Sequence, residues 1–474
     1  LTGAVIYTSS TGGGVIIGSL DAVFSMMVST LEFKILIFTS LLGAVVYLVS
    51  LSGGSKAYGE WAGRRMKTKR KSLLSACGLG CLVFIDDYFS CLFVGTVMKP
   101  LTDRCRVARA KLAWIVDSTA APVCIIAPVS SWAAAVAASL KSTPLEDQSM
   151  AAFMAAIPWN FYAILTIALV VFLIWRGRDF GPMLTAQAEA EKAENLRQDE
   201  EQTEPTGNGG LLEMIFPIAL LLIFSFAALL YSGGFWSDGP TKYQFGAAIG
   251  ASSSSSALCW AGFGTLVATM LLYVPRGVLS FTKCMDGAVN GMKLMLPANI
   301  ILVLAWTLSG VCRDLLQTPL FVQSIVTSGG AEWSIFLPAV IFVIAAFLSF
   351  STGTAWGTFG ILIPIVVPVV EAIDPGLTVV ALSATLAGSV FGDHCSPISD
   401  TTILSSAGSG CNHIEHVSTQ MPYSLTVAFS ACLGYVVAGL TGGNWILSIT
   451  TAVVALIGTV LLLHFWNSRR TAAT

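Results

Sequence analysis

Long apolar stretches separated by short polar segments dominate this chain. A helix needs about 20 apolar residues to cross the hydrocarbon core of a bilayer, and twelve stretches approach or exceed that length. They lie at 35–52, 73–98, 112–138, 151–175, 212–231, 244–273, 293–312, 333–350, 356–370, 376–391, 421–441 and 444–466. Residues 1–30 hold one more partial or broken span. The pattern predicts an all-α membrane protein, a polytopic helical bundle.

Polar residues interrupt several of these apolar runs. Residues 50–56, 252–256 and 349–354 are rich in Ser, Thr and Gly, and 252–256 are five consecutive serines. Non-helical backbone at membrane depth is tolerated only where protein or water satisfies its polar groups. We therefore expect discontinuous helices whose breaks face a cavity instead of lipid.

One segment is plainly aqueous. Residues 176–211 are charged and then rich in Pro and Gly, and they predict a linker between two halves. Arg176 and Arg178 directly follow a span, which favours the cytoplasmic side. Because its composition offers no apolar face to bury, we expect an exposed, mobile and dispensable loop.

The two halves repeat the same order of features. Each has an apolar arm, a Gly/Ser/Thr tip, an Ala-aromatic-Gly tripeptide and an apolar run that ends in acidic residues. The predicted first half is 1–175, with a re-entrant hairpin near 35–66 and an acidic break near 86–90. The linker follows it. The predicted second half is 212–474, with a hairpin near 333–370 and an acidic break near 392–402. We expect the hairpin tips near 53–55 and 351–354 to meet the breaks near Asp87 and Asp393 close to the membrane midplane.

Basic residues separate the two copies. Residues 53–111 contain twelve Lys or Arg, whereas residues 351–423 contain none. By the positive-inside rule the loops of the first copy favour the cytoplasm and those of the second favour the outside. Related halves of opposite orientation are the inverted repeats of secondary transporters, whose sites form near the midplane. We therefore expect a multi-pass protein of the cell inner membrane that works by alternating access.

Ionisable and hydroxyl residues lie inside the apolar runs, where charges are expensive and mark functional sites by default. The candidate substrate- and cation-binding residues are Asp86, Asp87, Asp117, Ser118, Thr119, Asp393, His394, Ser396, Ser399, Asp400 and Thr402, with the tip residues Ser52, Gly53, Gly54, Ser55, Ser351, Thr352, Gly353 and Thr354. The alternative for each acid is a loop residue near the headgroups or a buried helix cap.

Carboxylate, hydroxyl and carbonyl oxygens suit a hard cation, so we expect Na⁺ at Asp87 or Asp393 with oxygens of the hairpin tips. Two adjacent carboxylates in a dry site do not both ionise easily, and a proton could therefore compete with sodium. Helix N-termini at the breaks would favour an anionic substrate group equally well. His394 is either a proton carrier, a metal ligand or a hydrogen-bonded structural residue, and His413 and His416 read as loop residues.

Composition narrows the function classes. Of the 474 residues 55% are hydrophobic and 11% charged, and the net charge of −2 gives no signal for nucleic acid. The absence of a CxxC and of a GxxxxGK[ST] sequence predicts no metal cofactor and no ATP-driven pump. The alternative to a transporter is an enzyme, an intramembrane aspartyl protease. Val390 stands where the first Gly of that chemistry's Gly-x-Gly-Asp sequence would be.

The eleven residues Gly-Asp-His-Cys-Ser-Pro-Ile-Ser-Asp-Thr-Thr at 392–402 resemble the NhaC sodium/proton antiporter family, within the ion transporter superfamily. The similarity continues at 86–89, 100–104, 111–113, 116–122, 354–358, 413–417 and 420–423. The resemblance implies a two-repeat fold with re-entrant hairpins and a homodimer. Family members include antiporters, which tend to carry Lys where this chain has His394, and sodium-dependent carriers of amino acids or carboxylates. We therefore expect sodium/proton antiport or sodium-driven transport of a small organic solute.

Overall fold

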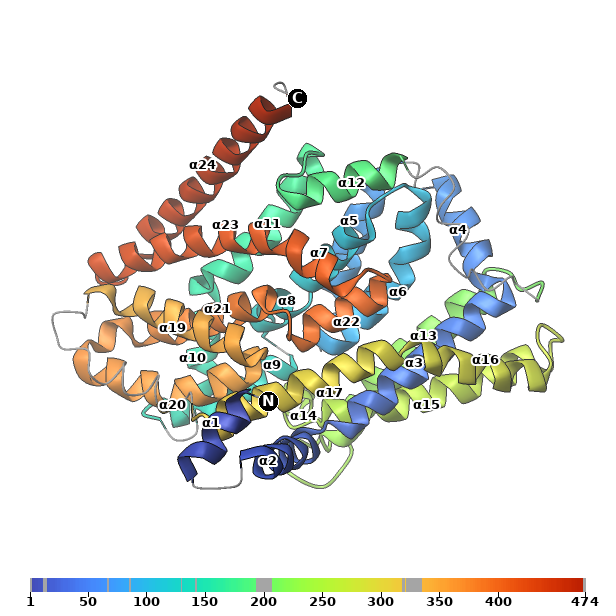
Figure 1. Ribbon diagram of the computed structural model, residues 1–474, viewed down its shortest axis with the longest axis horizontal. Coiled ribbons are helices and arrows are strands. Elements are labelled where there is room, and N and C mark those ends of the chain that lie inside the picture. The colour runs from blue at the N-terminus through green and yellow to red at the C-terminus, as the bar shows by residue number, and fades with distance from the viewer. Residues whose placement is uncertain are drawn as a thin grey trace.

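In the computed structural model, the regular secondary structure of the described residues is all helical (Figure 1). These residues are 2–11, 15–65, 68–84, 87–128, 130–140, 143–192, 207–317, 320 and 335–471. No strand occurs among them. The predicted all-α class is confirmed, while the inverted relation of the two halves stays a prediction.

The helices of the first half and the linker are α1 (Thr2–Thr11), α2 (Val15–Thr30), α3 (Phe33–Ser52), α4 (Gly54–Arg65), α5 (Lys69–Leu82), α6 (Asp87–Arg104), α7 (Arg109–Ser118), α8 (Ala121–Ile126), α9 (Ser131–Ser139), α10 (Ser149–Ala156), α11 (Phe161–Arg176) and α12 (Pro182–Lys192). Those of the second half are α13 (Leu212–Ser232), α14 (Phe245–Gly250), α15 (Ser254–Tyr273), α16 (Phe281–Leu294), α17 (Leu296–Gly310), α19 (Leu337–Thr352), α20 (Ala355–Ile373), α21 (Thr378–Cys395), α22 (Asp400–Ser409), α23 (His413–Leu440) and α24 (Trp445–Thr471). Short 3-10 turns at Glu146–Gln148, Ile157–Trp159 and Pro375–Leu377 and a π turn at Val311–Leu315 complete the described helices.

Seven described helices are long and apolar enough to cross a membrane: Phe33–Ser52, Leu212–Ser232, Ser255–Tyr273, Ala355–Ile373, Pro375–Cys395, His413–Leu440 and Trp445–His464. An eighth span arises if Ser149–Trp159 and Phe161–Arg176, which bend by 45° at their junction, are counted together. The chain is therefore a multi-pass membrane protein. The twelve continuous spans expected from hydropathy are too many for the described residues.

The predicted spans at 73–98 and 112–138 are wrong as continuous helices. The first divides into α5 and α6, and α6 begins at Asp87. The second divides into α7, α8 and α9, with Pro122 in the first turn of α8. Proline suits a first helical turn, where its missing N–H is not needed, better than a helix interior. The serine run likewise separates α14 from α15, whose N-terminal flank is Ser253.

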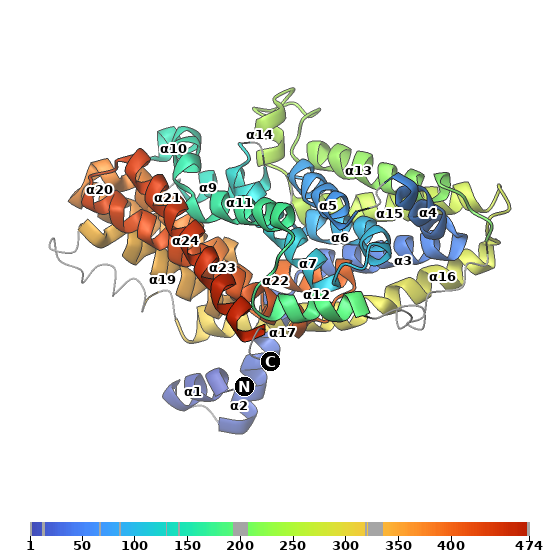
Figure 2. The same ribbon diagram turned by 90° about the horizontal axis from the view of Figure 1, so that it is seen from above.

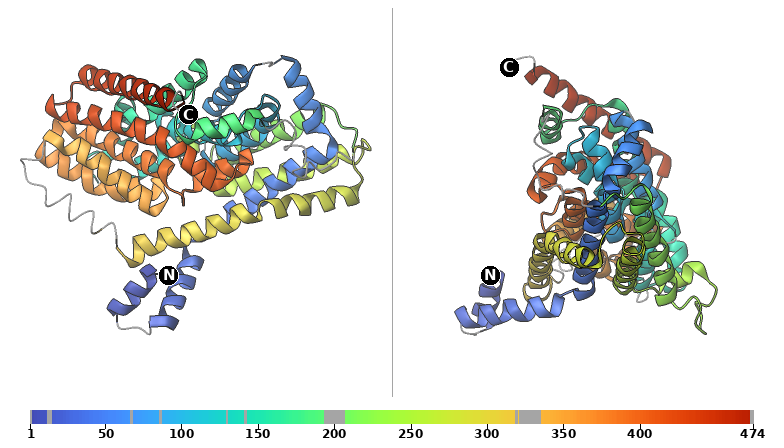
Figure 3. Two further views of the ribbon diagram at one scale, coloured as in Figure 1. Left: turned by 45° about the horizontal axis from the view of Figure 1, so that its top comes forward. Right: turned by 90° about the vertical axis from the view of Figure 1, so that its right-hand side faces the viewer.

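The helices form three neighbouring groups. The long helices α3, α13, α15 and α16 lie side by side at the lower right of Figure 1. Helices α19, α20, α21 and α23 pack together on the left, and α5, α6, α7 and α22 pack between the two groups. The pair α1 and α2 projects from the body, as Figures 2 and 3 show. The middle group brings the end of α7 against α22.

The described part of the linker is docked on the protein, so the expectation of a wholly exposed loop is wrong around residues 179–190. Phe180 and Met183 are fully buried, and α12 contacts α7 and α23. At the far end of the linker, Gly209 N donates to Ser52 O at 2.7 Å. Two apolar side chains at one end and glycines at the other dock the segment, although its average composition is polar. Residues 193–206 lie outside the described part.

A glycine in the left-handed region forms the tip of each hairpin. Gly53, between α3 and α4, has φ +91°, and Gly353, between α19 and α20, has φ +68°. Other residues rarely adopt this conformation, so the tips need glycine. The arms of the second hairpin are 16 and 19 residues long. Both turns fall inside the segments that the sequence marks as broken.

Candidate functional site

The break between α21 and α22 carries most of the polar cluster. Helix α21 ends at Cys395, because Pro397 forces the residue before it out of the helical region, and Ser396 accordingly has ψ 127°. The Ser399 side chain caps α22 by accepting from Thr402 N at 3.2 Å. Serine at an N-cap satisfies one of the free N–H groups of the first turn. The break is therefore a defined turn that aims the start of α22 into the protein.

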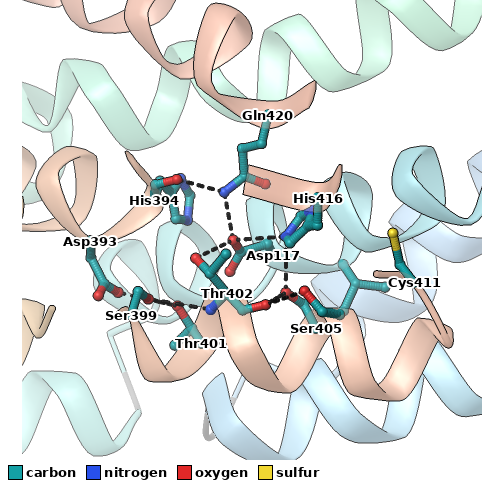
Figure 4. A network of polar contacts seen from close by, with 12 residues as sticks. Asp117, Asp393, His394, Ser399, Thr401, Thr402, Ser405, Cys411, His416 and Gln420 are labelled. Atoms are coloured by element: carbon teal, nitrogen blue, oxygen red, sulfur yellow. Dashed lines mark hydrogen bonds and ion pairs between the residues drawn. The ribbon is translucent and has the colours of Figure 1, made fainter. Parts of the chain in front are cut away.

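Asp393 lies one turn before this break and faces the start of α22. It is 1% exposed, and its Oδ2 accepts from Thr401 Oγ1 at 3.2 Å. Its Oδ1 has no hydrogen-bond partner among the described residues. In Figure 4, Asp393 stands beside Ser399 and Thr401. Asp393 thus has one buried carboxylate oxygen without a hydrogen-bond donor among the described residues.

Asp117, at the end of α7, is the best-connected carboxylate of the site (Figure 4). Its Oδ2 accepts from Gln420 Nε2 at 2.6 Å and from Thr402 Oγ1 at 3.1 Å. His416 Nε2 lies 3.5 Å from the same oxygen. Asp117 Oδ1 has no hydrogen-bond partner in the described part of the chain. A residue of the first half therefore meets α22 and α23 of the second half.

Two more buried carboxylates lie close by. Asp400, the first residue of α22, accepts a hydrogen bond from the Tyr88 hydroxyl, and Asp87 begins α6. The carboxyl groups of Asp400, Asp117 and Asp87 are near enough to Asp393 to interact with it electrostatically. We call these four aspartates the acidic centre.

No described lysine or arginine pairs with Asp117, Asp393 or Asp400. Buried carboxylates without cationic partners are costly. Asp117, Asp393 and Asp400 thus concentrate negative charge that no described lysine or arginine compensates.

His394 borders the site. Its Nδ1 lies 3.1 Å from the Tyr162 hydroxyl, and its carbonyl oxygen accepts from Gln420 Nε2 at 2.8 Å. Its Nε2 is buried without a hydrogen-bond partner among the described residues. His394 is therefore part of the Asp117 network through its backbone, and its ring is held on one side only.

The second hairpin tip reaches the break of α21. Ser396 Oγ donates to Phe350 O at 2.8 Å, and a Cβ added to Gly353 would lie 2.5 Å from Ile398 O. The hydroxyls of Ser351 and Thr352 donate to Leu348 O, and Thr354 caps α20. The tip touches the break through its backbone while its hydroxyls bond within the hairpin.

The first tip makes its close contacts elsewhere. Gly53 and Gly54 lie against the backbone of residues 207–214, at the start of α13. Ser52 Oγ donates to Val49 O, and Ser55 Oγ lies 3.4 Å from Ser50 Oγ. No described residue of this tip hydrogen-bonds Asp117, Asp393 or Asp400. The hydrogen bonds therefore place the first tip away from the break near Asp393, while helix α4, which begins at this tip, packs against α6, which begins at Asp87. That the first tip meets the break near Asp87 stays a prediction. Because Gly53 and Gly54 have no side chains, the backbone at the end of the linker can lie directly against the first tip.

The remaining predicted residues lie near α7. Ser118 is buried, and the Thr119 hydroxyl donates to Ile115 O while facing Gly80 of α5. Asp86 lies outside the described residues. Ser118 and Thr119 form the edge of the break between α7 and α8 and help to end α7 at the acidic centre.

Two important residues were missed by reading the sequence. His416 and Gln420 are 0% exposed and contact Asp117, although His416 reads as a loop residue in the sequence. Helix α23 begins at His413 under an Asn412 cap, well before the apolar run at 421. Residues four apart share a helix face, so the spacing of His416 and Gln420 was the available signal.

The donor set suits sodium or a proton better than a transition metal. The described residues contain no group of three or more His, Cys, Asp or Glu arranged to hold a metal ion. Around Asp393 the oxygens come from a carboxylate and from the hydroxyls of Ser399 and Thr401. Hard cations take oxygen ligands of this kind. Oxygen donors of this kind are chemically suited to a small hard cation or a proton.

The fold and the buried acidic centre define a multi-pass secondary transporter. Residues 123–440, more than half of the chain, match the Na⁺/H⁺ antiporter family. The chain belongs to this family, and the resemblance seen at 392–402 is confirmed.

The chain is also similar to three individual proteins. An uncharacterized protein of Haemophilus influenzae is 38% identical over 91% of this chain and 87% of its own length. The malate-2H(+)/Na(+)-lactate antiporter of Bacillus subtilis is 31% identical over 37% of this chain and 36% of its own. An uncharacterized Na(+)/H(+) antiporter of Haemophilus influenzae is 36% identical over 22% of this chain and 23% of its own. With its family, these antiporters identify the chain as a transporter and not as a protease.

Proposed function

We propose that the chain exchanges sodium ions for protons, and that both cations compete for the carboxylates of the acidic centre. The observation that carries this proposal is the pair of buried oxygens, Asp393 Oδ1 and Asp117 Oδ1, that have no described hydrogen-bond donor. A buried carboxylate is tolerated when a cation or a proton neutralises it. Either ligand removes the same excess charge, so binding of one should displace the other.

The breaks supply a means of alternating access. Site residues come from the end of α7, from α21 and α22 at a discontinuity, and from α23. Transporters with discontinuous helices move one bundle against another around a site near the midplane. Contacts such as Thr402 to Asp117 join the two halves and would change as the halves rock.

A second candidate is sodium-driven transport of a small organic solute, an amino acid or a carboxylate. The ten-residue helix α22 begins beside Asp393, and a helix N-terminus attracts anionic groups. The relative named as a malate-2H(+)/Na(+)-lactate antiporter agrees with this candidate. In that case sodium neutralises the aspartates and the solute binds beside it.

Vesicles that contain the purified protein and a pH-sensitive dye separate these candidates. When sodium-loaded vesicles are diluted into sodium-free buffer, sodium should leave, protons should enter and the lumen should acidify. The Asp393→Asn variant should abolish the signal, while Asp238→Asn, which changes a loop residue whose side chain is 95% exposed, should keep it. Sodium flux that requires an added carboxylate or amino acid would favour the second candidate. Vesicles that show neither response would refute sodium coupling.

A further inference from the structure

A buried ion pair connects the linker to the helices that support the acidic centre. Lys111 Nζ of α7 lies 2.7 Å from Oδ2 of Asp179, in the turn between α11 and α12. Each of the two side chains is 5% exposed. The other carboxylate oxygen of Asp179 accepts from the Tyr423 hydroxyl of α23 at 3.0 Å. One linker carboxylate therefore holds both α7 and α23.

The same two helices meet again at the acidic centre. Lys111, Trp114 and Asp117 follow one another at intervals of three along α7, and Gln420 and Tyr423 are three apart on α23. Residues at such spacing share a helix face. The Trp114 and Tyr423 rings lie 4.6 Å apart, and Gln420 donates to Asp117 at 2.6 Å. The two helices thus contact each other at the Trp114–Tyr423 ring pair and again at Gln420 and Asp117, between the Asp179 tie and the acidic centre.

Stability alone does not explain this ion pair. Removing two charges from water offsets much of their attraction, and well-packed apolar residues often stabilise as well as a buried pair. Helix α12 also has surface contacts that would hold it, among them the ion pair of Lys69 with Glu191. Asp179 has two fixed partners, Lys111 and Tyr423. Directional bonds to both define the register of two helices, which apolar packing does less well.

We propose that Asp179 is a positioning residue for the acidic centre. By holding Lys111 and Tyr423 it fixes the register of α7 against α23, and it thereby sets the distances from Gln420 to Asp117. The described part of the linker then contributes to the geometry of the acidic centre, in addition to connecting the two halves of the chain. The inference rests on the proposed function in so far as Asp117 helps to bind the transported cation.

Three variants test the proposal in vesicles and in detergent. Asp179→Asn should raise the KM for sodium at least tenfold, because α7 and α23 lose their common anchor. The double variant Lys111→Met with Asp179→Leu should restore the unfolding temperature measured without sodium, since no uncompensated charge remains buried, but its KM should stay raised. Glu191→Gln, which breaks an exposed ion pair on the same linker helix, should change KM less than twofold. If KM recovers in the double variant together with stability, the role of Asp179 is structural and the proposal is overturned.

Amide hydrogen exchange tests the positioning without any transport assay. Asp179→Asn should speed exchange in peptides that cover 111–118 and 416–423, while peptides of α20 should exchange as in the unchanged protein. Unaltered exchange in both peptides overturns the proposal. If the unchanged protein shows no sodium-dependent transport, the proposed function fails, and the exchange data still decide whether Asp179 positions α7 and α23.

Discussion

Replacing Asp393 with Asn removes one charge from the acidic centre and keeps the shape of the side chain. The Asn carbonyl oxygen can still accept the hydrogen bond from Thr401, which is 3.2 Å from the carboxylate in the structure. Asn does not carry the charge that would attract a cation to the buried Oδ1 position. The apolar packing around the site should remain, so the variant should fold.

The size of the effect follows from the charge that is lost. A contact with a charged group is worth about 1.5–3 kcal/mol, and each 1.4 kcal/mol is roughly a factor of ten in affinity. Sodium should therefore bind roughly 10- to 150-fold more weakly. With sodium at about 100 times the Kd of the unchanged protein, binding adds about 2.7 kcal/mol of stability. A hundredfold weaker site would add only about 0.4 kcal/mol by the same relation.

Thermal unfolding of the purified protein, with sodium and with an inert cation, measures this difference directly. The variant should lose most of its sodium-dependent stabilisation. Its unfolding temperature without sodium should stay level or rise, because a buried charge without a cationic partner has been removed. Asp238→Asn provides the same chemical change at an exposed loop position and should leave the sodium effect intact. If Asp393→Asn keeps the full sodium effect, Asp393 is structural and Asp87 becomes the next candidate for the cation site.

Four further substitutions test separate parts of the structure by unfolding in detergent. Gly353→Ala should destabilise by more than about 2 kcal/mol, since left-handed backbone costs roughly 1–2 kcal/mol and the new Cβ would lie 2.5 Å from a carbonyl oxygen. Gly177 also has a left-handed φ, +69°, but a Cβ added to it would have open space around it, so Gly177→Ala should lose only the stability that left-handed backbone costs. If Gly177→Ala and Gly353→Ala lower the free energy of unfolding equally, the close packing of the second tip is disproved. Gln420→Leu should cost about 1.5–3 kcal/mol by removing a donor to Asp117, and an unchanged midpoint would show that this contact is unimportant. A hydrogen bond from Lys69 holds the pKa of the Glu191 carboxyl below its usual range. The ion pair therefore stabilises the folded protein fully above pH about 4.3, and this stabilisation is lost as the pH falls through the lowered pKa. Glu191→Gln should therefore cost less than about 1 kcal/mol at pH 7 and nothing at pH 3, and a larger loss at pH 3 would contradict this sign.

The sequence by itself determined the local features of this protein. Long apolar runs identified the membrane helices, because a helix among lipids must be apolar over its whole length. Pro397 predicted the break after α21, and the glycines at 53 and 353 predicted the hairpin turns, because backbone sterics depend on single residues and their neighbours. Asp393 and Asp117 were found as candidates because a carboxylate in an apolar run is conspicuous.

Only the tertiary structure decided how these features meet. Thr402 and Gln420 contact Asp117 across 285 and 303 residues of chain, and hydropathy contains no information on such pairs. The first hairpin tip packs on the end of the linker although its sequence resembles the second tip, because close approach depends on which backbone lies opposite. Asp179 lies in a segment of polar average composition, yet it is buried in contact with Lys111 and Tyr423, which are far from it in the sequence. Side-chain pairing of this kind is set by the register and packing of whole helices, which no local pattern specifies.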